Sequence, residues 1–316
     1  MGFGLSEEYV LRVVGSLDDI DSSGWNACAN PGGESPFDPF LSYEFLHALE
    51  SSGSAIPETG WAAQHLVLET TTGEIVACVP LYLKGHSQGE YVFDHAWADA
   101  FERAGGEYYP KMLGAVPFTP VTGRRILIRP RPDADEVAMQ LIGAVAEVAQ
   151  QLEVSSLHFN FLHESQWEQM VRLGFLARTD QQFHWTNCDY TSFDDFTSGM
   201  SSKKRYNLKR ERRDALREGI EIEWLSGSDL TESHWDAFFQ FYMDTGSRKW
   251  GRPYLNREFF SRLGETMADR VLLVMARRDG NYVAGALNLI GGDCLYGRYW
   301  GTTEYAPFLH FELCYY

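Results

Sequence analysis

The segment Pro39-Phe-Leu-Ser-Tyr-Glu-Phe-Leu-His-Ala-Leu49 returns later in the chain as Pro253-Tyr-Leu-Asn-Arg-Glu-Phe-Phe-Ser-Arg-Leu263. Each copy has a residue that can cap the first turn of a helix, Ser42 in the first and Asn256 in the second. Apolar side chains four residues apart follow in both copies, so the pattern predicts the same amphipathic helix twice. The match favours an internal duplication.

A second match follows each of these predicted helices. Residues 65–84 (HLVLETTTGEIVACVPLYLK) resemble residues 271–290 (VLLVMARRDGNYVAGALNLI), with Gly73 and Gly280 in corresponding turns. A glycine turn between two apolar runs is typical of a β-hairpin, and Asp279-Gly280 is the stronger of the two turn signals. Because both matches occur in the same order, we interpret the chain as two related halves.

The two halves predict an α/β (α+β) protein with mixed central sheets flanked by helices. We place the first domain at residues 1–190, with an insertion at about 85–123, and the second at residues 191–316. The pattern predicts helices over 134–150, 165–175, 200–218 and 230–246, and strands over 155–161 and 177–187. The second domain is expected to lack the strand, helix and strand that close the first.

The composition limits the classes of partner. With 316 residues, 44% of them apolar, the chain can bury two cores, and its net charge of −17 disfavours broad adhesion to nucleic acid or anionic lipid. The N-terminus has acids where a signal peptide needs basic residues, and no apolar run is long enough to span a membrane. We therefore expect a cytoplasmic protein without membrane insertion. The sequence indicates no oligomeric state.

Five segments carry a family resemblance. They resemble the FemAB-like predicted N-acyltransferases of bacteria, once catalogued as a domain of unknown function and similar to the Fem aminoacyltransferases. The segments are PFLSYEFLHALE (39–50), PLYLKGHSQGEYVFDHAWADAFERAGGEYYPKM (80–112), AVPFTPVTGRR (115–125), SSKKRYNLKRERRD (201–214) and LYGRYWG (295–301).

The resemblance implies tandem duplicated GNAT-like (acyl-CoA N-acyltransferase) domains. It further implies transfer of an acyl or aminoacyl group to an amine, from acyl-CoA or aminoacyl-tRNA as co-substrate and with no tightly bound cofactor. The acceptor would be a small-molecule amine or a cell-wall-precursor amine related to peptidoglycan. The usual GNAT pyrophosphate loop does not follow Tyr299–Glu304, so acetyl-CoA is not expected to bind in the second half.

The inserted segment has the composition of a pocket wall. Attack by an amine requires a group that accepts its proton, and we nominate Asp94 or Asp99 as this base. Tyr108, Tyr109 and Lys111 place phenols and a cation near these acids, as a polar ligand would require. A solvated carboxylate or a helix cap is the alternative interpretation of each acid.

Two basic stretches could bind phosphate. Residues 203–213 concentrate positive charge on a predicted helix in an acidic chain, and we assign Lys204, Arg205 and Lys209 to an acyl donor or to contact with transfer RNA. A solvated helix face is the alternative. Arg124, beside Gly123, could instead meet the pyrophosphate of acetyl-CoA in the first half.

In the second half, we assign Arg298, Trp300 and Glu304 to substrate binding, because Arg298 and Trp300 alternate along a predicted strand. His310 and Cys314 lie four residues apart and could form a nucleophilic pair, but apolar neighbours favour a buried thiol. The five cysteines and the histidines lack metal-ligand spacing, so no metal is expected. A non-catalytic ligand-binding module that keeps the doubled fold is the alternative function.

Overall fold

The computed structural model describes residues 9–33, 35–248 and 253–316, which divide into two compact units. The first unit runs to Leu176 and includes residues 254–266 and 291–293. The second unit takes the remaining described residues from Ala177 onward. The division therefore lies earlier than the expected boundary at residues 190 and 191. Residues 1–8 belong to the acidic N-terminus for which no signal peptide is predicted, and they lie outside the described residues.

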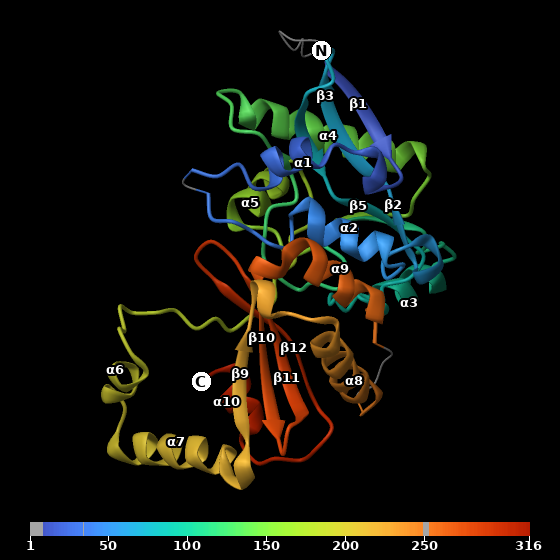
Figure 1. Cartoon of the computed structure of the whole chain (residues 1–316). Helices are drawn as coiled ribbons and strands as arrows, with labels where there is room; N and C mark the ends of the chain where they lie inside the picture. Colours follow the sequence, from blue (N-terminus) through green and yellow to red (C-terminus); the bar gives the residue numbers. More distant parts are fainter. Residues whose placement is uncertain (1–8, 34, 249–252) are drawn as a thin grey trace. The chain divides into compact units, whose positions relative to one another are not determined.

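The first unit contains two sheets, each four-stranded over the described residues (Figure 1). One has the order β1-β3-β4-β7 and antiparallel pairs; the other has the order β2-β5-β6-β8, in which β6 and β8 are parallel. The strands are β1 (Tyr9–Val14), β2 (Trp61–Ala63), β3 (His65–Thr70), β4 (Ile75–Val79), β5 (Leu81–Lys84), β6 (Lys111–Gly114), β7 (Leu127–Ile128) and β8 (Leu157–Phe159). The predicted mixed α/β fold is confirmed.

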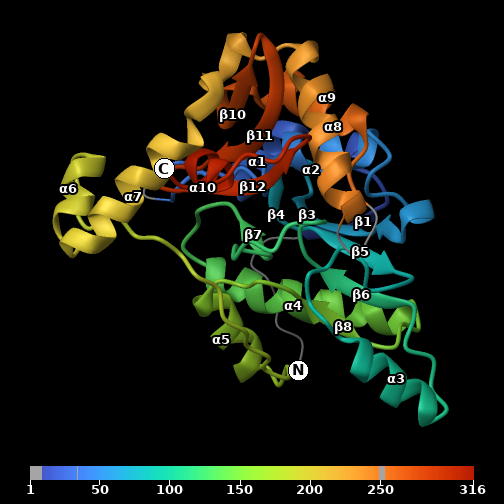
Figure 2. The same ribbon diagram turned by 90° about the horizontal axis from the view of Figure 1, so that it is seen from below.

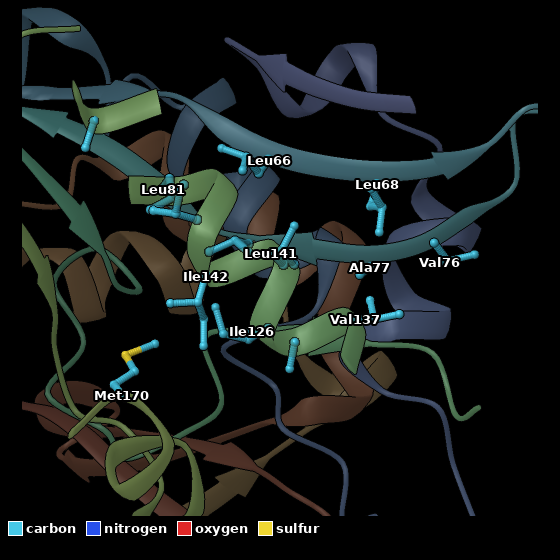
Figure 3. Packing of buried hydrophobic residues seen from close by; sticks show 14 of the residues in the cluster. Leu66, Leu68, Val76, Ala77, Leu81, Ile126, Val137, Leu141, Ile142 and Met170 are labelled. Carbon is cyan, nitrogen blue, oxygen red and sulfur yellow. The ribbon is translucent and has the colours of Figure 1, made fainter. Parts of the chain in front are cut away.

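Helices flank these sheets. They are α1 (Ser22–Ala29), α2 (Tyr43–Ser51), α3 (His95–Arg103), α4 (Ala134–Gln151), α5 (Glu164–Arg172) and α9 (Arg257–Met267), the last of which lies in the first unit up to Thr266. Val137, Leu141 and Ile142 of α4 pack against Leu66 and Ala77 of the β1-β3-β4-β7 sheet (Figure 3). These apolar positions recur at helical spacing, so α4 buries one face against the sheet.

The chain leaves one sheet for the other at Pro80. Strand β4 ends at Val79 and β5 begins at Leu81, yet β4 pairs with β3 while β5 pairs with β2 and β6. Proline has no backbone N–H to donate to a ladder, which favours a break in pairing at this position. The predicted hairpin 65–84 is thus β3 and β4 followed by a strand that crosses into the second sheet.

Both copies of the repeat form the predicted elements. Ser42 Oγ accepts a hydrogen bond from the backbone N–H of Phe45 at the start of α2, and Asn256 Oδ1 accepts one from Phe259 at the start of α9. The second hairpin is β10 (Val271–Arg278) and β11 (Asn281–Ile290). Its turn residues Asp279 and Gly280 have φ of 50° and 79°, as a type I′ turn requires.

The second unit is built on the antiparallel sheet β12-β11-β10-β9. Its other elements are β9 (Glu221–Leu225), β12 (Leu295–Thr302), α6 (Phe193–Ser198), α7 (Ser202–Ala215), α8 (Glu232–Arg248) and α10 (Leu309–Cys314). Strand β11 is buried on both faces. The side chain of Phe238 from α8 lies close to Gly285. Leu309 of α10 packs near Ala284 and Ala286. Helices α6 and α7 lie beside this sheet rather than on it (Figures 1 and 2).

The remaining elements are single 3₁₀ turns. They are η1 (Leu17–Asp19), η2 (Pro57–Thr59), η3 (Arg217–Gly219), η4 (Gly227–Asp229) and η5 (Ala268–Arg270).

The strand predicted over residues 177–187 is wrong. This segment has no regular secondary structure, and Phe183 and Trp185 are 89% and 67% exposed. Apolar and polar residues alternate in this segment, but the segment has no neighbouring strand to pair with. Alternation alone supplies no hydrogen-bond partners for the backbone.

Arg125 is expected to be a structural arginine of the first unit. It is 1% exposed and donates to the backbone carbonyls of Asn160, Arg124 and Val121 at 3.1, 2.8 and 2.9 Å. Burial lowers the pKa of Arg125 to about 10, so the guanidinium stays charged at neutral pH. Arg125→Met should lower the free energy of unfolding by about 3 kcal/mol, because three buried acceptors lose their donor.

Urea unfolding measures this loss. Arg103→Met, on the exposed side of α3, is the matched control and should change the free energy of unfolding by less than about 0.5 kcal/mol. Equal stability of the two variants would contradict the structural role.

Candidate functional site

Three large side chains lie in a row across the second sheet of the first unit. Trp61 of β2 pairs in register with Lys84 of β5, and Lys84 pairs with Lys111 of β6. Directly opposed residues of neighbouring strands project from the same face. Both lysines are completely buried, which is unusual for a charged residue, and the strands that carry them are otherwise largely apolar. Strands β5 and β6 lie side by side in Figure 2.

The ammonium of Lys111 is surrounded by acceptors from the inserted segment. Its Nζ lies 2.5 Å from Asp94 Oδ2, 2.9 Å from Glu90 Oε2 and 2.8 Å from Ser87 Oγ. The hydroxyl of Tyr108 also donates to Asp94 Oδ2, at 2.8 Å. We call Lys84, Ser87, Glu90, Asp94, Tyr108 and Lys111 the Lys111 cluster. All of its members are buried.

The two carboxylates of the cluster differ in acidity. Burial raises the pKa of Asp94, but hydrogen bonds from Lys111, Ser87 and Tyr108 outweigh burial and lower the pKa to about 2. Burial also raises the pKa of Glu90, and here the nearby Lys111 cation only partly offsets it, so the pKa of Glu90 stays above its usual value. Asp94 is therefore a weak base at neutral pH, and Glu90 is the stronger proton acceptor.

Lys84 is held differently from Lys111. Its Nζ lies 3.4 Å from the centroid of the Trp61 ring and 3.4 Å from the carbonyl oxygen of Gln88. Burial lowers the pKa of Lys84 to about 7, against the attraction of Glu90 and together with the repulsion of Lys111. Lys84 can thus gain or lose its proton near neutral pH.

Polar atoms without a hydrogen-bond partner gather in this part of the described chain. They are Glu90 Oε1, Asp94 Oδ1, Trp61 Nε1 and the Tyr82 hydroxyl. A buried polar atom without a partner costs free energy, and an unfilled ligand or water position commonly accounts for it. The Trp61 and Tyr82 rings also contact each other, with centroids 5.3 Å apart.

The structure brings together several residues nominated from the sequence. Asp94, Tyr108 and Lys111 contact one another, and Tyr109 joins them because its hydroxyl lies 2.8 Å from Ser87 Oγ. Asp99 does not join them, because it is exposed on α3. Lys84, Ser87 and Glu90 were not nominated; the available signal was a lysine placed in each of two apolar strand segments, LYLK and KMLG.

The nominated residues of the second unit have partners of their own. Arg298 lies at the irregularity of the β11–β12 pairing, with its guanidinium 5.1 Å from the Tyr299 ring. The rings of Trp300 and His310 are 5.1 Å apart, and Glu304 accepts a hydrogen bond from Arg278 at 2.8 Å. Burial raises the pKa of the Cys314 thiol to about 12, which disfavours a thiolate nucleophile.

The basic residues of α7 fall into two groups, one that contacts other parts of the unit and one that is exposed. Arg205 donates to the carbonyl of Ser198 at 3.1 Å, and Arg212 makes a two-pronged ion pair with the buried Glu312. Lys204 is exposed, and Lys209 forms an exposed ion pair with Asp194 at 3.3 Å. Lys204 and Lys209 are therefore exposed to solvent, while Arg205 and Arg212 hold neighbouring parts of the unit.

Arg124 is half-buried and contacts backbone carbonyls. Its guanidinium donates to the carbonyl oxygens of Cys28 and Ala29. Burial lowers the pKa of Arg124, and the Asp38 carboxylate opposes this.

No group of three or more His, Cys, Asp or Glu side chains is arranged to hold a metal ion within residues 9–33, 35–248 and 253–316. None of the helices described there combines the length and apolar character needed to cross a bilayer.

Comparison with known proteins gives a family match. A family model named FemAB-like, described as peptidoglycan biosynthesis and recognition, matches residues 16–316. No curated protein matches the chain.

The solved structures found are distant in sequence. L-PGS from Bacillus licheniformis is 12% identical, with a TM-score of 0.47, covering 87% of this chain and 70% of its own. A tandem GNAT protein from the clavulanic acid biosynthesis pathway is 12% identical, with a TM-score of 0.35 and coverage of 94% and 76%. The aminoglycoside 6'-N-acetyltransferase AAC(6')-Ih from Acinetobacter baumannii is 16% identical, with a TM-score of 0.32 and coverage of 57% and 99%.

Proposed function

Because the chain belongs to the FemAB-like family, we propose that it is an N-acyltransferase that moves an acyl or aminoacyl group onto an amine. The family's description supports a transferase role in peptidoglycan biosynthesis, and the acceptor in this proposal is a cell-wall-precursor or other small amine in the cytoplasm. The observation that carries the proposal is the Lys111 cluster, in which a buried carboxylate with a raised pKa lies beside fixed charges.

The proposed reaction uses these residues as follows. The acceptor ammonium gives one proton to Glu90, and its freed lone pair forms the new C–N bond to the donor carbonyl while the donor's ester or thioester bond breaks. The second proton of the nitrogen leaves with the departing ribose oxygen or CoA sulfur. Lys111 holds the Glu90 carboxylate in place through the 2.9 Å ion pair. Asp94, with its low pKa, anchors Lys111 and Tyr108 rather than taking up the proton.

The donor in this proposal is acyl-CoA or aminoacyl-tRNA, and the exposed side of α7 binds its phosphates. Lys204 and Lys209 supply the charge there, and exposed phosphate contacts of this kind each contribute about 1 kcal/mol at low salt. The backbone contacts of Arg124 give it less freedom to meet a pyrophosphate.

A transfer assay tests the function. Protein is mixed with radiolabelled acetyl-CoA or with radiolabelled aminoacyl-tRNA, together with a set of primary amines, and labelled amide is counted. We expect amide from one donor class. Donor binding without amide from either donor would instead favour the non-catalytic binding module and contradict the proposal.

The basic helix is tested in the same assay. The double variant Lys204→Ala/Lys209→Ala should raise the KM for the donor by about 30-fold at low salt, because two phosphate contacts of about 1 kcal/mol each are lost. Arg172→Ala removes an exposed charge from α5 and serves as the control. An unchanged KM in the double variant would place the donor elsewhere.

A further inference from the structure

The unpartnered atoms near Lys111 indicate what the site binds. Glu90 Oε1 and Asp94 Oδ1 are hydrogen-bond acceptors, each on a carboxylate whose other oxygen is bonded to Lys111. Both side chains are more than nine-tenths buried, at 4% and 3% exposure. A ligand that fills these positions must therefore donate hydrogen bonds, and a positive charge on it would be favoured by two carboxylates in a poorly solvated place.

The balance of charges in the cluster favours the binding of one more cation. Lys111 neutralises one of the two carboxylates, and Lys84 is the cation that can balance the other. Lys84 is poorly held for this purpose, since its Nζ contacts the face of the Trp61 ring and makes a long hydrogen bond to Gln88 O. A ligand ammonium that bonds directly to Glu90 can therefore replace the positive charge of Lys84.

We infer that the Lys111 cluster binds a primary amine as its ammonium ion, at Glu90 Oε1 and Asp94 Oδ1, and that Lys84 gives up its proton when this cation enters. The inference rests on the proposed function, since it assigns the acceptor's binding position and charge state. The protons and charges balance as follows. One ammonium ion enters the site, and one proton leaves Lys84 for the solvent in every molecule in which Lys84 was protonated. Where Lys84 was protonated, the site thereby keeps the same net charge with and without the amine.

The ligand must pass the segment that covers the cluster. Residues 85–94 contain neither helix nor strand, and the exposed side chains of Tyr91 and Phe93 lie on this segment. Segments without regular pairing open at lower free-energy cost than strands. The amine is thus expected to enter between this segment and strands β5 and β6.

The binding should depend on pH in a defined direction. The charged groups that act on Lys84 are Glu90 from the covering segment and Lys111 from β6, and His86 and Asp94 lie in the same covering segment. Below pH 7 Lys84 is protonated and competes with the ligand; above pH 7 it is neutral, while an alkylamine with a pKa near 10 stays charged. Affinity should therefore rise between pH 6 and pH 8.

Calorimetry with ethylamine, without any acyl donor, tests the inference, and ethanol serves as the uncharged control of similar size. Ethylamine should bind at least about tenfold more tightly than ethanol. At pH 7, where Lys84 is half protonated, binding should release about half a proton per ligand, seen by repeating the titration in buffers of different ionisation enthalpy. Equal affinity for the two compounds, or no proton release, would overturn the inference.

Variants then locate the effect. Lys84→Met should abolish the proton release and tighten ethylamine binding at pH 6, whereas Glu90→Gln should weaken it about tenfold. Glu102→Gln, exposed on α3, should match the parent protein. Proton release that persists in a folded Lys84→Met variant would overturn the assignment; the wild-type titration remains decisive if a variant does not fold.

The two hypotheses fail separately. Ethylamine binding with proton release, but no amide formed from any donor, supports the amine site and contradicts the acyltransferase. Amide formation without selective ammonium binding supports the acyltransferase and overturns the amine site.

Discussion

Replacing Glu90 by glutamine is expected to lower kcat for amide formation by about 10²–10⁴-fold, the usual contribution of a general base. Glutamine keeps the size of the side chain and an oxygen that can accept from Lys111, but it cannot take up a proton. The raised pKa of Glu90, caused mainly by burial, brings this carboxyl closer to the working pH than an exposed glutamate. The measurement is single-turnover transfer at saturating donor and amine.

One control variant and the pH dependence of the rate separate this role from a general effect on the site. Glu102→Gln changes an exposed glutamate of α3 and should leave kcat within about twofold of the parent protein. In the parent protein the rate should increase with pH as the Glu90 carboxyl loses its proton, and the Glu90→Gln variant should lack that step. A folded Glu90→Gln protein with undiminished kcat would remove Glu90 from the reaction.

The duplicated elements were the most predictable part of the fold. The repeated motif beginning at Pro39 and Pro253 folds as α2 and α9, and the two glycine turns join β3 to β4 and β10 to β11. Capping residues, helical spacing and turn residues act over a few positions, so they are readable from sequence. The FemAB-like resemblance carried by five segments is confirmed by the family match over residues 16–316.

The error over residues 177–187 arose where long-range pairing decides the structure. Residues 177–187 alternate as a strand would but have no partner, and α9 joins the first unit up to Thr266 although it follows α8 of the second along the chain. Contacts of this kind depend on tertiary packing, which a local pattern does not encode.

The candidate site was predictable in part for the same reason. The inserted segment was selected because it gathers acids, phenols and a lysine, and its Asp94, Tyr108 and Lys111 do meet. The role of Lys84 depends on the β5–β6 register, which places it beside Lys111, and that register cannot be read from either strand alone. Glu90 is buried and paired with Lys111, whereas Asp99 is exposed, and neither property can be read from the local sequence.

Lys111→Met should lower the free energy of unfolding by about 3–5 kcal/mol at pH 7, the cost typical of removing one partner from a buried ion pair. The ammonium holds Glu90 and Asp94 at 2.9 and 2.5 Å, and its loss leaves two buried carboxylates beside each other with only Lys84 to oppose them. Urea unfolding measures the change, with Arg172→Met on the exposed side of α5 as the control.

The pH dependence distinguishes charge from packing. In the parent protein the pKa of Asp94 is about 2, so its stabilising contribution is present above the unfolded pKa near 4 and is lost as pH falls toward 2. Without Lys111 the same carboxyl is buried and poorly paired, so its pKa rises above the unfolded value and protonation on acidification stabilises the variant. The difference between the two proteins should therefore narrow between pH 7 and pH 4.

Neutralising the carboxylates provides the decisive comparison. The triple variant Lys111→Met/Glu90→Gln/Asp94→Asn contains no charged member of the cluster except Lys84, so it should recover at least about 2 kcal/mol relative to Lys111→Met alone. If Lys111 acted mainly by filling space, both variants would be equally unstable and the deficit would not change with pH. Recovery in the triple variant, together with a deficit that shrinks on acidification, would assign the loss to two unpaired buried charges, the same charges that bind the ligand ammonium.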